Sequence, residues 1–139
     1  MKVKSSGRSF VLWLVVALCA AVAPLPAYSA DQPAVQIESA VVCQDVVDRQ
    51  PVGSGDKFAK ETPRVYCFCR VVGAREDTQI THNWYYKGSL KASVKLNVRS
   101  SDWRTWSSKT MAPEWDGEWM VEILSADGAP LESIIFFIQ

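Results

Sequence analysis

Apolar and polar residues alternate with a period of two along much of the chain, which is the pattern of β-strands that bury one face. The clearest case is residues 90–99 (LKASVKLNVR), where Leu, Ala, Val, Leu and Val alternate with Lys, Ser, Lys, Asn and Arg. A strand with one solvent-exposed face is typical of an antiparallel sheet. This segment therefore predicts the fold class, an all-β antiparallel structure.

Further strands are expected on both sides of this segment. The pattern predicts them over residues 34–42, 64–72, 80–87 and 118–125, and within the aromatic residues 100–115. The last strand, residues 131–139 (LESIIFFIQ), is apolar on both sides, so it is expected in the middle of a sheet or beneath a partner. About seven short strands without a helical period predict an antiparallel β-sandwich, immunoglobulin-like in type.

Residues 44–63 interrupt every period with aspartates, prolines and glycines. The pattern predicts a long loop, with Phe58 inserted into the body of the domain. Loops of this length in a small domain are often functional, so the loop is a possible part of a site.

The first thirty residues have the three-part layout of a secretory signal peptide. Lys2, Lys4 and Arg8 precede an uncharged apolar run of fourteen residues, and small residues follow. The run is shorter than the ~20 residues that cross a bilayer as a helix. We therefore expect a signal helix over residues 1–29, cleaved after Ser29 or Ala30. The remaining single β-sandwich domain, residues 30–139, is expected in the periplasm, with no transmembrane span after cleavage.

The charge that remains after residue 30 argues against nucleic acid as a partner. Twelve basic and fifteen acidic residues leave a net charge of −3. A protein that neutralises phosphates needs an excess of basic residues.

Three cysteines remain after signal cleavage: Cys43, Cys67 and Cys69. An oxidising compartment favours one disulfide and one leftover thiol. Cys67 and Cys69 point to the same side of a strand and are poorly placed to bond each other. We expect Cys43–Cys67, which closes a loop of about 25 residues and contributes roughly 3 kcal/mol; Cys43–Cys69 is the alternative. With one histidine in the chain, no metal or cofactor is expected. A redox or copper-handling role for Cys67 and Cys69 is a further hypothesis.

The sequence does not indicate an enzyme. It contains no nucleophile-elbow, zinc-protease or phosphate-loop motif. His82, the one histidine, lies on a predicted strand beside Trp84, where a packed structural role is the favoured interpretation.

The most unusual stretch runs from residue 103 to residue 119 and contains four of the six tryptophans. That much aromatic surface is either buried or offered to a partner. Trp84 and Trp119 have apolar neighbours on their strand faces and are expected in the core. The candidate binding residues are Trp103, Arg104, Trp106, Lys109, Trp115, Tyr85 and His82.

Two functions from different classes fit these residues. The preferred hypothesis is a non-catalytic module that docks on an envelope protein through the Trp/Arg-rich stretch. The alternative is a carbohydrate-binding module that stacks polysaccharide on Trp103, Trp115 and Tyr85. A cation–π contact that only closes one end of the sandwich is the structural alternative to both.

Several strings along the chain resemble a known family. They include DRxPVGxGDxF after Cys43, VYCF, IxHxWYYKG, PxWxGxWxVEI and, most specific, WRTWSSK at residues 103–109. The chain from Cys43 to its C-terminus resembles the bacterial domain of unknown function 2914 family. The resemblance implies an exported or membrane-tethered protein. It also supports the Cys43–Cys67 pairing, because the family pattern has a hydroxyl residue at the place of Cys69.

Overall fold

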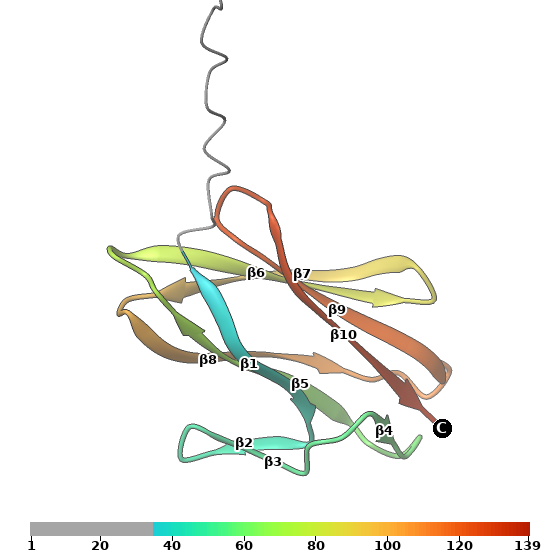
Figure 1. Ribbon diagram of the computed structural model, residues 1–139. Coiled ribbons are helices and arrows are strands. Elements are labelled where there is room, and N and C mark those ends of the chain that lie inside the picture. Colours follow the sequence, from blue (N-terminus) through green and yellow to red (C-terminus); the bar gives the residue numbers. More distant parts are fainter. Residues whose placement is uncertain (1–34) are drawn as a thin grey trace, which may run out of the picture. The chain divides into compact units, whose positions relative to one another are not determined.

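The computed structural model describes residues 35–139, which fold into β-strands without a helix (Figure 1). The predicted signal helix and its cleavage position lie outside the described residues. Within them, no helix is long and apolar enough to cross a membrane. The strands are β1 (Gln36–Cys43), β2 (Asp45–Val47), β3 (Gln50–Val52), β4 (Lys57–Phe58), β5 (Arg64–Val72), β6 (Thr78–Tyr86), β7 (Ser89–Val98), β8 (Asp102–Thr110), β9 (Gly117–Leu124) and β10 (Pro130–Ile138).

The strands form two larger sheets and a separate hairpin. One sheet has the order β1-β5-β8 and the other β4-β10-β9-β6-β7, while β2 pairs with β3. Every pairing is antiparallel except the short contact of β4 with β10. The predicted all-β, antiparallel class is therefore confirmed.

The two larger sheets share one apolar core, and the period of two accounts for it. On β5, alternate residues from Val65 to Val71 are fully buried, as the pattern predicts. Trp84 and Trp119 are fully buried from the opposite sheet and contact Phe136, with ring centroids 6.2 and 6.1 Å away. A buried tryptophan removes about 150–250 Å² from water. At about 25 cal/mol per Å² each contributes roughly 4–6 kcal/mol before entropy costs, so these two residues anchor the core.

The segment expected to be one loop contains the β2–β3 hairpin, and β2 packs near β5. The hairpin turn places Asp48 and Arg49 at φ 51° and 59°. Two-residue turns of this kind favour glycine, so an Asp-Arg pair gives little sequence signal for them. Phe58 is buried as predicted, with its ring edge-on to Phe136 at 5.9 Å.

The expected Cys43–Cys67 disulfide is contradicted by the structure, in which Cys43, Cys67 and Cys69 are free, buried thiols. The strand register gives the reason. Cys67 is opposite Val42 and points into the core, whereas Cys43 is opposite Tyr66. Because adjacent residues of a strand point to opposite faces, Cys43 leaves the sheet on the side away from both other thiols, and neither predicted pairing can form.

Two apolar residues depart from the predicted pattern. Leu90 is 54% exposed because a bulge between Trp84 and Tyr85 shifts the pairing of β6 with the start of β7. Ile135 is 51% exposed on β10, which pairs with β9 on one side and with β4 only at its last residues. The terminal strand is therefore neither central nor fully covered.

Candidate functional site

The aromatic stretch around β8 is divided between two places. Along β8, Trp103 and Lys109 lie opposite core-facing residues of β5, whereas Arg104 and Trp106 lie opposite Arg70 and Phe68 on the outer face. Residues 103 and 109 are about 20 Å apart along an extended strand. The binding residues predicted in this stretch therefore cannot form one site.

One end of the stretch lines an open groove of about 470 Å³ where β8 meets β7 and the tip of the β2–β3 hairpin. We call it the arginine–tryptophan groove. Its lining residues are Arg49, Asn97, Arg99, Trp103, Arg104, Thr105 and Trp106. Three of the predicted binding residues, Trp103, Arg104 and Trp106, are therefore brought together.

The two tryptophans of the groove are held by aromatic and cationic neighbours. Trp103 packs against the core, and the guanidinium carbon of Arg49 lies 5.6 Å from its ring centroid. Trp106 stacks on Phe68, with ring centroids 6.2 Å apart and an interplanar angle of 18°. Trp106 remains 36% exposed. A fixed, partly exposed indole beside arginines is the composition of a binding hot spot.

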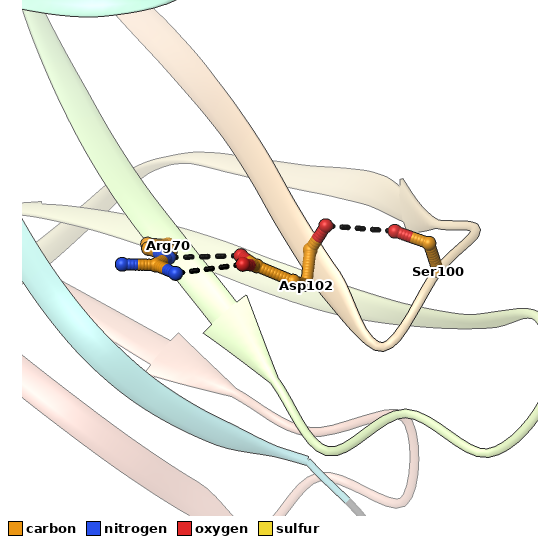
Figure 2. Close-up of polar contacts among 3 residues, drawn as sticks. All are labelled: Arg70, Ser100 and Asp102. Atoms are coloured by element: carbon orange, nitrogen blue, oxygen red, sulfur yellow. Dashed lines mark hydrogen bonds and ion pairs between the residues drawn. The ribbon is translucent and has the colours of Figure 1, made fainter.

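An ion pair between Arg70 and Asp102 lies beside the groove. Two hydrogen bonds join the side chains, with Nε–Oδ1 at 2.8 Å and Nη2–Oδ2 at 2.6 Å (Figure 2). The hydrogen bond raises the pKa of Arg70 and lowers that of Asp102. Ser100 Oγ donates to the Asp102 carbonyl at 2.7 Å, which fixes the backbone where β8 begins (Figure 2).

The only other ion pair among residues 35–139 joins Lys60 to Asp116. Within this described range, Arg49, Arg99 and Arg104 thus have no carboxylate partner within 4.0 Å. Guanidinium groups bind carboxylates and phosphates through paired hydrogen bonds, so the groove is suited to an anionic group.

The other end of the stretch is an aromatic cluster in which two lysines lie over the Trp115 ring. Lys109 Nζ lies 4.7 Å from the Trp115 ring centroid, and Trp115 packs edge-on to Trp119 at 5.6 Å. Trp119 Nε1 donates to the Trp115 carbonyl at 3.0 Å. Lys91 lies 5.8 Å from the same Trp115 ring. Lys109 and Trp115 are therefore brought together, but as a closure of the core and not as part of the groove.

Tyr85 lies neither in the arginine–tryptophan groove nor in the aromatic cluster around Trp115. It is opposite Met120 of β9, one residue along from the inward pair Trp84–Val121, so it lies on the outer face of its sheet. The three stacking residues of the carbohydrate hypothesis, Trp103, Trp115 and Tyr85, are thus not assembled into one platform.

His82 is fully buried in a hydrogen-bonded network that connects the two sheets. Its Nδ1 lies 2.7 Å from Ser107 Oγ, which also accepts a hydrogen bond from Trp84 Nε1 at 3.0 Å. Its Nε2 lies 3.5 Å from Cys69 Sγ.

Burial keeps this network uncharged. It lowers the pKa of His82 to about 4 and raises that of Cys69 to about 12. Because His82 is fully buried, a ligand in solvent cannot reach it, and its prediction as a binding residue is contradicted. The network acts as a structural link, and Ser107 is a part of it that sequence reasoning missed.

Within the described range, no group of three or more histidine, cysteine, aspartate or glutamate side chains is placed to hold a metal ion. The groove residues that sequence reasoning missed are Arg49, Arg99, Asn97 and Thr105. Arg49 is in the segment flagged as a possible part of a site, and no local pattern connects it to β8.

In a comparison with known families, residues 77–138 match the family described as a protein of unknown function, DUF2914. The match spans β6 to β10 and includes the groove residues of β7 and β8. A search of curated proteins finds no match.

Proposed function

We propose that this chain, which belongs to the DUF2914 family over residues 77–138, is a non-catalytic interaction module that docks on a protein of the bacterial envelope. The observation that carries the proposal is the arginine–tryptophan groove. Tryptophan and arginine are the side chains most enriched among residues that dominate binding energy at protein interfaces. Here two of each converge with a third arginine at one open surface.

The accessibility of the reactive side chains supports a non-catalytic role. Cys67, Cys69 and His82 have no solvent-exposed surface. Catalysis by acid, base or nucleophile needs the group within hydrogen-bond reach of the substrate. The groove instead offers guanidinium groups, which stay protonated and bind anions without transferring protons.

We also propose that the fold is an antiparallel β-sandwich of immunoglobulin-like topology, which the strand order supports. Seven strands form facing sheets of order β1-β5-β8 and β10-β9-β6-β7, with β4 added at the edge. In immunoglobulin domains a buried tryptophan lies on the third strand of this arrangement. Trp84 of β6 is in that position.

The proposal of export to the periplasm rests on the sequence of residues 1–29, with its basic start, apolar run and small residues before position 30. A free, signal-cleaved domain would meet envelope proteins there.

A carbohydrate-binding module is the alternative proposal. Trp106 supports it, because an exposed indole beside arginines also suits an acidic sugar. The separation of Trp103, Trp115 and Tyr85 reduces its support, since a sugar chain stacks best on coplanar, neighbouring rings.

The proposal is tested by photo-crosslinking in bacterial cells that make the full chain. A benzophenone side chain replaces Trp106 in one variant and Leu90 in the control, because Leu90 is also exposed and apolar but lies at the opposite end of β7 from the groove. We expect discrete protein adducts from position 106 that are absent from position 90 and are lost on adding Arg104→Ala. Identical adducts from both positions, or none from position 106, would contradict docking through the groove.

A further inference from the structure

The groove lies along a strand edge that has no hydrogen-bonded neighbour. β8 is the last strand of its sheet and pairs only with β5, whereas β7 belongs to the other sheet. Residues of both β7 and β8 line the groove, so it runs along this edge. The free edge of a strand presents N–H and C=O groups that an extended peptide can pair with.

The charge at this edge differs from that of the rest of the domain. Residues 35–139 contain fourteen acidic and twelve basic residues, yet the groove is lined by three arginines and no acidic residue. Asp102, which directly precedes the lining residue Trp103, is already engaged by Arg70. Among residues 35–139 the three arginines have no carboxylate within 4.0 Å, so the groove favours an acidic ligand, because like-charged guanidinium groups gain from a shared anion.

One of these arginines has a strained backbone. Arg49 has φ 59° at the second central position of the hairpin turn, where glycine is the favoured residue. Its side chain reaches across to the Trp103 ring. Strained residues of this kind are concentrated at binding sites, where the surrounding structure keeps them.

We infer that the docking partner presents an extended acidic peptide segment, which adds as a strand to the free edge of β8 and places carboxylates at alternate positions against Arg49, Arg99 and Arg104. This inference rests on the proposed function and adds the chemistry of the partner. Alternation follows from the geometry of a strand, in which residues i and i+2 share a face. Paired backbone groups are the reason to favour a peptide over an acidic glycan, which has no regular series of amides.

The test is a titration of the full chain with a ten-residue peptide of alternating glutamate and valine, followed by tryptophan fluorescence and calorimetry. The matched peptide has lysine in place of glutamate, and oligogalacturonate serves as an acidic glycan. We expect the glutamate peptide to bind with an affinity that falls as salt is raised, and the lysine peptide not to bind.

Arg49→Gly separates binding from folding, because glycine suits the turn while removing the guanidinium. We expect it to weaken binding of the glutamate peptide about tenfold without lowering the melting temperature. The matched control is Lys57→Ala, which removes an exposed cation on β4 that does not line the groove; it should leave the affinity unchanged.

Absence of binding by the glutamate peptide, equal affinities for Arg49→Gly and Lys57→Ala, or binding of oligogalacturonate alone would overturn the inference. Its failure can be told apart from that of the proposed function. Protein adducts at position 106 without glutamate-peptide binding would leave docking in place and overturn the acidic strand. If position 106 of the otherwise natural chain gives no protein adducts, docking itself is overturned.

Discussion

The guanidinium carbon of Arg49 lies 5.6 Å from the centroid of the Trp103 ring, so the turn of the β2–β3 hairpin reaches the edge strand β8. This contact joins two segments that are far apart in the sequence. It adds about 0.5–1 kcal/mol at a partly exposed site, while a left-handed backbone at a non-glycine residue costs roughly 1–2 kcal/mol. The contact alone does not offset the strain, which agrees with a role for Arg49 beyond folding.

Substitutions at Arg49 should separate backbone strain from the side-chain contact. Arg49→Ala keeps the strain of φ 59° and removes the guanidinium, whereas Arg49→Gly removes both. We expect Arg49→Gly to be more stable than Arg49→Ala by about 1 kcal/mol in urea unfolding. Equal stabilities would show that the turn relaxes and that Arg49 carries no strain.

The Ser107 hydroxyl should matter for stability far more than its neighbour on the same strand. Ser107→Ala leaves Trp84 Nε1 without an acceptor and His82 Nδ1 without a partner, both in the core. We expect a loss of about 2–3 kcal/mol in the free energy of unfolding. Ser108→Ala, at an exposed position of β8, is the matched control and should change it by less than about 0.5 kcal/mol. Similar losses from both variants would contradict the network.

Burial of His82 predicts a defined pH dependence. The pKa of His82 is about 4 in the folded protein, against an ordinary value of 6.5, because burial disfavours the charged ring. Between these values the unfolded chain binds a proton that the folded chain does not, so stability falls as the pH is lowered from about 6.5 to about 4. The loss reaches about 3 kcal/mol.

Urea unfolding at a series of pH values measures this slope. The control is His82→Gln, which should lack the slope in that window while keeping a polar side chain at the site. Stability that is flat from pH 7 to pH 4 in the natural chain would contradict a neutral, buried His82.

The three free thiols should be unreactive until the chain unfolds. Cys43, Cys67 and Cys69 are buried, and burial raises the pKa of each thiol. We expect slow alkylation in buffer, three alkylated cysteines per domain after denaturation, and a melting temperature that a reducing agent does not change. A lower melting temperature under reducing conditions would instead indicate a disulfide.

The sequence predicts the sheets well because their signal is local. The strand predicted over residues 64–72 has the same bounds as β5. Trp84 and Trp119 are recognised as core residues from their immediate strand neighbours. The disulfide prediction is wrong because a bond depends on which residues of β1 and β5 are opposite, and register is not a property of either strand alone.

The candidate site is predicted only in part for the same reason. Trp103, Arg104 and Trp106 are found as a string, but their separation from Lys109 and Trp115 follows from the length of β8. Arg49 and Arg99 reach the groove through tertiary packing of the hairpin and of β7. No periodicity in the chain indicates that a turn in residues 44–63 lies over a tryptophan of β8.

The central claim is that Arg49, β7 and β8 form one surface for an acidic strand, and it is tested most directly by residue-resolved NMR of the domain during titration with the glutamate peptide. We predict amide shifts concentrated at Arg49, at Asn97 to Arg99 and at Trp103 to Trp106, with new protection from hydrogen exchange along β8. Shifts centred on Lys109 and Trp115, or shifts without protection of β8 amides, would contradict it.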